Sequence, residues 1–120
     1  MSSGLPLVSA IIPAYNAAST IDRTLASVQA QTYPALEIVV VDDGSTDDTA
    51  ARVQAWAEHD PRIRLLRQSN AGVAAARNAA IRAAMGSLIA PIDADDIWMP
   101  RKIEAQVQAL FDYGDALGVA

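Results

Sequence analysis

Acidic residues gather in two short windows of this 120-residue chain, which together hold half of its fourteen Asp and Glu residues. They are Asp42, Asp43, Asp47 and Asp48 in the first window, and Asp93, Asp95 and Asp96 in the second. Like charges this close repel, so a folded chain tolerates them only in water, at helix starts or around a cation. Two carboxylates separated by one residue, as Asp93 and Asp95 are, can share a hard cation such as Mg²⁺ or Mn²⁺ that also binds substrate phosphates. Such an ion could take up the negative charge of a departing diphosphate.

Each window also has a structural explanation. Two acids at this spacing arise often by chance, and the second window could be a solvated turn or a cap for the helix near Pro100. In the first window, Asp47 and Asp48 are best explained as complements to a helix N-terminus. For Asp43, which directly follows an apolar strand, we favour contact with a ligand. Its carboxylate could accept a hydrogen bond from a base N–H or a ribose hydroxyl, and Gly44 would let the backbone approach that ligand.

Short apolar runs alternate with longer amphipathic ones, which predicts alternating strands and helices. The predicted strands are 7–13, 36–41, 63–67 and 88–92, with a fifth beginning at 116–120. The predicted helices are 19–31 with Ser19 as N-cap, 45–60 opened by a capping box of Ser45 and Asp48, 73–85 closed by Gly86, and 100–113. This order indicates an α/β fold, a parallel sheet with helices on its faces. Ligands bind such sheets at the carboxyl ends of the strands, where both acidic windows and the Tyr15-Asn16 pair fall.

Other polar and aromatic residues carry weaker signals. Arg77 lies in an alanine-rich helix, where its planar guanidinium could bind a phosphate or a base edge, or could simply be an exposed charge. His59 is most simply a surface residue. Trp56 and Trp98 are expected to pack in the core, although Trp98 borders the second acidic window.

Composition bounds the class of protein. Hydrophobic residues make up 52% of the chain, enough for a core, so we expect one folded domain over 1–120 rather than disorder. Without cysteine, a disulfide scaffold, a thiolate zinc site and a cysteine nucleophile are excluded. A net charge of −5 argues against a nucleic-acid partner. No apolar run approaches the roughly 20 residues of a membrane span, and no signal peptide is visible, so we expect a cytoplasmic domain.

Four motifs, in this order, resemble the start of a family 2 glycosyltransferase. They are VSAIIPAYN at 8–16, VVDDGSTD at 40–47, NAG at 70–72 leading to ARN at 76–78, and IDADD at 92–96. The four cover nearly the whole chain, so their combination is far more specific than any one of them. The resemblance implies a GT-A fold and inverting transfer of a sugar from a nucleotide-sugar donor, most simply a UDP-sugar, with Mn²⁺ or Mg²⁺.

The resemblance also implies roles for single residues. Pro13 and Tyr15 would border the nucleobase, Asp43 would accept the N–H of the base, and Arg77 would lie near the base or the diphosphate.

On the sugar and metal side, Asp93 would hold the ribose or the donor sugar, and Asp95 would bind the metal ion. Asp42 and Asp96 match acidic positions of the family and are given supporting roles.

The family's acceptor site and general base lie in a second half, so we expect the general base beyond Ala120 and interpret the chain as the N-terminal part of a longer transferase. The acceptor could be a saccharide, a lipid or a protein, with peripheral contact to the inner membrane face through the missing part. An exposed sheet edge leaves a homodimer open. Two alternatives remain, a non-catalytic nucleotide-binding fragment and a phospho-acceptor signalling domain. The second is disfavoured because the only lysine, Lys102, is not at a strand end. No dinucleotide-binding glycine motif or P-loop is present.

Overall fold

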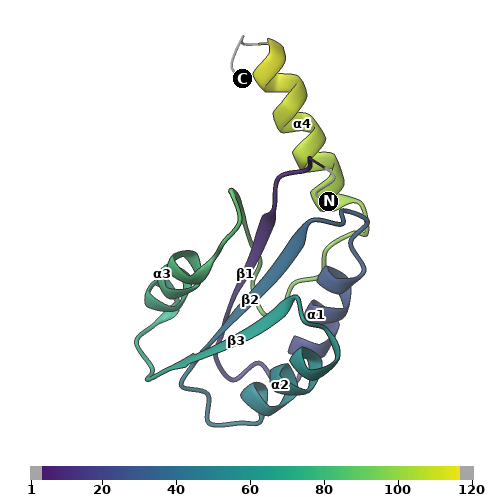
Figure 1. Cartoon of the computed structure of the whole chain (residues 1–120). Coiled ribbons are helices and arrows are strands. Elements are labelled where there is room, and N and C mark those ends of the chain that lie inside the picture. The colour runs from purple at the N-terminus through teal and green to yellow at the C-terminus, as the bar shows by residue number, and fades with distance from the viewer. Residues whose placement is uncertain (1–3, 117–120) are drawn as a thin grey trace.

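The structure, a computed structural model, describes residues 4–116 as an alternation of strands and helices (Figure 1). The strands are β1 (Val8–Ala14), β2 (Leu36–Asp43), β3 (Ile63–Gln68) and β4 (Leu88–Pro91). The helices are α1 (Ile21–Gln29), α2 (Thr49–His59), α3 (Val73–Ala83) and α4 (Lys102–Ala116). The predicted alternation of strands and helices is therefore confirmed over this range.

All strand pairs are parallel, in the order β3-β2-β1-β4. The register places Ala14 opposite Asp42, and Asp43 opposite Gln68, so the carboxyl ends of β1, β2 and β3 reach the same edge of the sheet. The chain runs outward from β1 to β3 and then returns to the other side of β1 as β4. Ligands bind open α/β sheets at such a change of direction, outside the carboxyl ends of the strands.

Helices cover both faces of the sheet, with α1 and α2 on one face and α3 on the other (Figure 1). On β2, Ile38 and Val40 belong to the larger core with α1 and α2, whereas Val39 and Val41 pack with Ala76 and Ala80 of α3. Side chains alternate between the faces of a strand, so a strand covered on both sides is apolar throughout. This explains why five of the six residues 36–41 are apolar.

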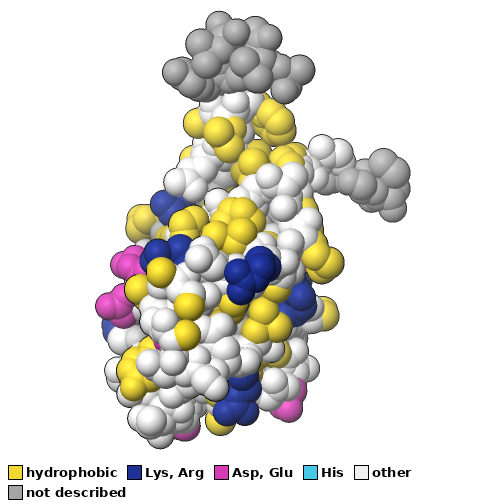
Figure 2. Space-filling model, turned by 90° about the vertical axis from the view of Figure 1, so that its left-hand side faces the viewer, with side chains coloured by type: hydrophobic (Ala, Val, Ile, Leu, Met, Phe, Trp, Pro, Cys, Tyr) yellow, Lys and Arg dark blue, Asp and Glu magenta, His cyan; other side chains and the backbone are white. Residues whose placement is uncertain are grey.

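β4 is the least covered strand. Its Ile89 is 40% exposed on the α3 side, and Ile81 of α3 is 44% exposed. Figure 2 views the molecule from this side and shows hydrophobic and basic side chains interspersed over the face. Within residues 4–116 the outer edge of β4 pairs with no other strand. Self-association through a sheet edge stays a prediction.

A buried carboxylate joins α3 to the amino ends of the strands. Glu37 accepts hydrogen bonds from the Ser9 hydroxyl, from the backbone N–H of Met85 (2.5 Å) and from the Arg64 guanidinium (3.2 Å). Burial raises the pKa of Glu37, but the bonds from Ser9 and Met85 and the charge of Arg64 outweigh burial and hold this pKa below its ordinary value. Gly86 lies against this cluster, because a Cβ there would sit 2.5 Å from Ser9 Oγ. Its role is close approach, since α3 already ends at Ala83 rather than at the predicted Met85.

Two predicted N-terminal caps are wrong. Ser19 is not the N-cap of α1, which begins at Ile21 after Thr20. The capping box of Ser45 and Asp48 does not form, because Ser45 Oγ accepts from Asn16 N (2.9 Å) and Asp48 makes no side-chain cap bond.

The last helix, α4, continues through residues 114–116, past the predicted end at 113, so residue 116 is helical rather than the start of a strand. Residues 117–120 of that predicted strand lie outside the described residues. Ile103 and Val107 of α4 are buried in the larger core, and the rest of the helix projects from the body (Figure 1). Among the described helices, none combines the length and apolar character needed to cross a membrane.

Candidate functional site

Two cavities open at the carboxyl edge of the sheet. The first, of about 220 Å³, is mostly apolar and is lined by Pro13, Ala14, Tyr15, Asp43, Asn70, Gly72, Val73 and Ala76. The second, of about 340 Å³, is more polar and is lined by Pro13, Tyr15, Asn16, Ala17, Ser19, Thr20, Ala94 and Asp95. Pro13 and Tyr15 line both cavities, so Asp43 and Asp95 flank one shared wall. The predicted gathering of the two acidic windows at one rim is what the structure shows.

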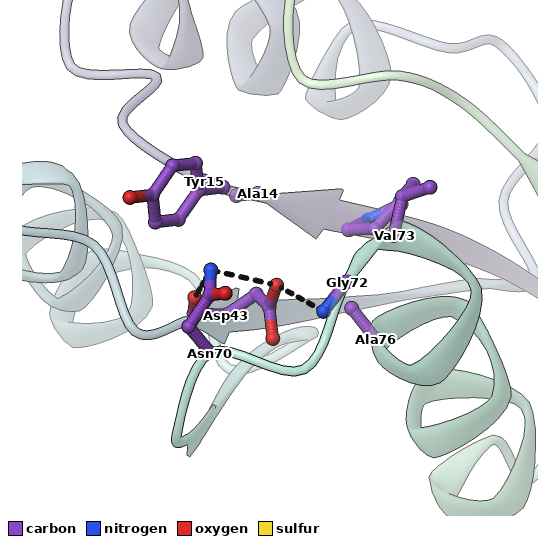
Figure 3. A pocket seen from close by; sticks show the side chains of 8 residues that line it. Ala14, Tyr15, Asp43, Asn70, Gly72, Val73 and Ala76 are labelled. Carbon is purple, nitrogen blue, oxygen red and sulfur yellow. Dashed lines mark hydrogen bonds between the residues drawn. The ribbon is translucent and has the colours of Figure 1, made fainter.

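Asp43 lies at the end of β2, is 3% exposed, and ties the β3–α3 loop to that strand (Figure 3). Its Oδ1 accepts hydrogen bonds from Gln68 Nε2 (2.8 Å) and Ala71 N (2.9 Å). Its Oδ2 accepts from Gly72 N (3.0 Å) and, at a longer 3.3 Å, from Asn70 Nδ2. The bond from Gln68 and those from the two backbone N–H groups hold the pKa of Asp43 below its ordinary value, although burial raises it. The carboxylate is therefore an ionised acceptor.

Gly44, directly after Asp43, allows this loop to come close. Its φ is +74°, and a Cβ at this position would lie 2.7 Å from Asn70 N. A side chain here would be strained and would also push Asn70 outward. The glycine therefore serves the approach of two loops, whereas the sequence suggested the approach of a ligand.

Tyr15 is held by a loop that is bound to the β2–α2 loop. Asn16, with a φ of +48°, accepts from Thr46 N (2.8 Å) through Oδ1 and donates its own N–H to Ser45 Oγ (2.9 Å). Two residues after Asn16, the backbone N–H of Ala18 donates to Asp47 Oδ2 (3.2 Å). These bonds position Tyr15, which is 51% exposed, at the wall between the cavities. Residues 45–47 therefore hold the loop that follows β1 and carries Tyr15.

The second acidic window is open to solvent. Asp93, Asp95 and Asp96 are exposed, and within residues 4–116 their carboxylates make no hydrogen bond or ion pair. Asp95 lines the polar cavity. In the same part of the chain, no three His, Cys, Asp or Glu residues are placed to hold a metal ion together. The available oxygen ligands fit Mg²⁺ or Mn²⁺, which keep several waters and take substrate phosphates as further ligands.

Four of the residues to which the resemblance assigned roles are not among those that line either cavity: Arg77, Asp42, Asp93 and Asp96. Arg77 is half-buried, and its guanidinium makes no hydrogen bond or ion pair within the described residues. Asp42 is 2% exposed. Its Oδ1 has no hydrogen-bond partner among the described residues, and its Oδ2 lies 4.0 Å from Arg67 Nε. Because neighbouring strand residues point to opposite faces, Asp42 faces away from the cavity that Asp43 lines.

The sequence interpretation missed several cavity residues. Asn70, Val73 and Ala76 line the apolar cavity, and Thr20 lines the polar one. The rule that ligands lie at carboxyl ends of strands could have found Asn70, which follows β3 closely. Thr20 carried no signal in the sequence. The expected packing of Trp98 is confirmed, since it is 8% exposed in the larger core.

The chain matches the model of glycosyl transferase family 2 over residues 9–120 and therefore belongs to that family. It is 45% identical to the UDP-Glc:alpha-D-GlcNAc-diphosphoundecaprenol beta-1,3-glucosyltransferase WfgD of Escherichia coli, covering 87% of this chain and 41% of that protein. It is 42% identical to the chondroitin synthase of Escherichia coli, covering 83% of this chain and 15% of that protein. The chain thus spans less than half the length of these relatives.

Solved structures give the same result for the fold. Residues 1–349 of S. aureus TarS in complex with UDP match with a TM-score of 0.81 at 28% identity, covering 91% of this chain and 33% of that one. The mannosyltransferase PcManGT of Pyrobaculum calidifontis, in complex with GDP-Man and Mn²⁺, matches with a TM-score of 0.79 at 37% identity, covering 90% and 32%. The predicted GT-A fold is confirmed.

Proposed function

We propose that this chain supplies the donor-binding part of an enzyme that transfers a sugar from a nucleoside-diphosphate sugar, first of all a UDP-sugar, to a saccharide, lipid or protein acceptor. The observation that carries the proposal is the shared wall of Pro13 and Tyr15 between a cavity with Asp43 and a cavity with Asp95. An apolar cavity with one charged acceptor suits a base, and the neighbouring polar cavity suits a diphosphate and sugar. The UDP and GDP-Man complexes of similar proteins support this assignment.

The apolar cavity would hold the base. Tyr15 and Pro13 offer it an apolar wall, and Asp43 offers a buried, ionised acceptor for a ring N–H. The carboxylate already accepts from four donors, which uses its lone-pair capacity. A base N–H would therefore replace the longest of these contacts, the 3.3 Å bond from Asn70 Nδ2. Asn70 Nδ2 also donates to the backbone oxygen of Asp43 (3.0 Å), so its amide would stay at the site and direct its other hydrogen toward a neighbouring carbonyl of the base.

The polar cavity would hold the diphosphate. Asp95 would bind Mn²⁺ or Mg²⁺, which when bound neutralises charge on the diphosphate leaving group. Asp93, exposed on the same loop, would hold the ribose or the donor sugar. Arg77 would reach the base or the diphosphate from α3 only by a change of its side-chain conformation, since it lines neither cavity.

The chemical step needs groups from elsewhere. Inversion at the anomeric carbon requires a general base that deprotonates the acceptor hydroxyl, and we place it outside this chain. We further propose that the protein works in the cytoplasm, where nucleotide sugars would reach it, or at the inner face of the membrane. For the phospho-acceptor alternative, a lysine is wanted at the site. Lys102 instead lies over the Trp98 ring, 5.8 Å from its centroid.

Calorimetry with UDP, with and without Mn²⁺, tests the proposal. Binding is expected to strengthen with Mn²⁺, and Asp95→Asn is expected to remove that gain while leaving metal-free binding unchanged. Asp48→Asn, which alters an exposed carboxylate paired with Arg52 on α2, is the matched control and should bind like the wild type. The proposal fails if UDP, GDP and dTDP all fail to bind in the presence of Mn²⁺, or if Asp95→Asn keeps the full gain.

A further inference from the structure

Polar side chains along one side of α1 and of the residues just before and after it hold the acidic loop that follows β4. They are Thr20, Thr24, Ser27 and Gln31, spaced by four, three and four residues, as one side of a helix requires. All four bind the backbone of the segment 94–103. Before α4 begins, this segment has no helix or strand of its own. Its path past the site is therefore set by α1.

Thr24 is the buried centre of this arrangement, with 0% exposure. Its Oγ1 lies 2.7 Å from the carbonyl oxygen of Asp96 and 2.9 Å from that of Ala94. A hydroxyl has one proton to donate. Thr20 Oγ1, also 2.9 Å from the Ala94 oxygen, supplies the second donor. The two carbonyls that flank Asp95 are thus both satisfied from α1.

This arrangement determines where the Asp95 side chain points. Ala94 is 9% exposed, with its carbonyl drawn toward α1, whereas Asp95 is exposed and lines the polar cavity. Further along, Ser27 Oγ accepts from Trp98 N (3.1 Å). Gln31 donates to the Met99 oxygen (2.7 Å) and accepts from the N–H at the start of α4. The loop is anchored on both sides of its acidic residues.

We propose that Thr24 is a positioning residue for Asp95: its buried hydroxyl holds the loop in the conformation that presents the carboxylate to a divalent cation and diphosphate. The inference rests on the function proposed above. A loop ordered in advance does not lose conformational freedom when the ligand binds, so its affinity is higher. Removing a group that orients a metal ligand typically weakens metal affinity about 10- to 100-fold.

The test compares Thr24→Val, which keeps the shape and removes the hydroxyl, with Thr24→Ser, which keeps the hydroxyl. UDP and uridine are titrated with and without Mn²⁺. In Thr24→Val the gain in UDP affinity from Mn²⁺ should fall about tenfold or more, while uridine binding stays unchanged and Thr24→Ser restores the gain. Val28→Ala on the same helix is the control, because Val28 is equally buried but touches only the core. The Val28→Ala variant should have a lower free energy of unfolding, but Mn²⁺ should still increase its affinity for UDP as much as in the wild type.

Amide hydrogen exchange of residues 93–99 gives a readout that needs no nucleotide. Exchange there should be faster in Thr24→Val than in Val28→Ala, with the sheet amides similar in both. Ser27→Ala, at a half-buried position, should show a smaller change in the same direction, and it replaces Thr24→Val if that variant does not fold.

Two results overturn the inference. One is a full Mn²⁺ gain in Thr24→Val, and the other is exchange of 93–99 no faster than in Val28→Ala. If the wild type shows no Mn²⁺-dependent binding of UDP, GDP or dTDP, the proposed function is wrong instead, and hydrogen exchange alone decides whether Thr24 fixes the loop.

Discussion

Replacing Asp43 with asparagine should destabilise the fold as well as weaken base binding, because the carboxylate is part of the loop structure. The asparagine side chain has only one oxygen. Its NH₂ group must therefore take the place of either Oδ1, to which Gln68 and Ala71 donate, or Oδ2, to which Asn70 and Gly72 donate. Gln68 or Asn70 could turn its own side-chain amide to offer an oxygen. The backbone N–H of Ala71 or Gly72 cannot, and in either orientation one of them loses its acceptor.

The magnitude follows from that count. One donor left without an acceptor costs about 1–3 kcal/mol, and the remaining bonds lose the strength that an ionised acceptor gives. We therefore expect Asp43→Asn to lower the free energy of unfolding by about 2–3 kcal/mol at pH 7. The pKa of Asp43 is lowered from 3.8 in the folded state, so its contribution is complete above pH 3.8. It is lost as the pH falls through the folded value, and the difference between the two proteins should shrink there.

Urea unfolding at pH 7 and at several acidic pH values measures this difference. The matched control is Asp48→Asn, whose solvent-exposed ion pair with Arg52 contributes little to stability because water screens it. The reasoning is refuted if Asp43→Asn unfolds within about 0.5 kcal/mol of the wild type, or if the difference is the same at pH 7 and at low pH. The first result would mean that the loop does not depend on the carboxylate.

Three further changes follow from the same structure. Gly86→Ala should lower the unfolding free energy in a urea titration by about 1–3 kcal/mol, because its Cβ would lie 2.5 Å from Ser9 Oγ; a neutral result would show that the loop can move away. The Arg62 guanidinium lowers the pKa of Asp60 from 3.8 to about 2, so Asp60→Asn should cost about 2 kcal/mol at pH 7. That stabilisation should be lost in acid unfolding as the pH falls from 3.8 to about 2, and equal acid sensitivity of both proteins would contradict it. Tyr15→Ala should weaken UDP binding in calorimetry about tenfold, as expected for a lost aromatic wall, and leave stability within about 0.5 kcal/mol of the wild type; unchanged affinity would remove Tyr15 from the site.

The fold was predictable because its signals are local. In the run 36–41 every residue except Glu37 is apolar because β2 is covered on both faces, and that pattern is visible in the sequence. Helix ends were predicted less well, because capping side chains found partners in other loops. Ser45 is the clearest case, since it binds the backbone of Asn16 instead of its own helix.

The site shows the same division. The rule that parallel strands end at one edge predicted that Asp43 and Asp95 would share a rim, since it depends only on the order of elements. Nothing in the sequence predicted that Asp43 would accept from Gln68 at the end of β3 and from three donors of the following loop, or that Thr24 would hold the carbonyls beside Asp95. These contacts join residues far apart in the chain.

The sequence by itself determined the alternation of strands and helices, the edge at which the acidic residues gather and the family to which the chain belongs. Only the tertiary structure decided which acids are free to bind a ligand. Asp95 is exposed, and Asp42 is buried on the other face of the sheet from Asp43. The physical reason is that hydrophobic patterning reflects burial along one element, whereas the hydrogen bonds of a carboxylate depend on which donors the packed loops bring to it.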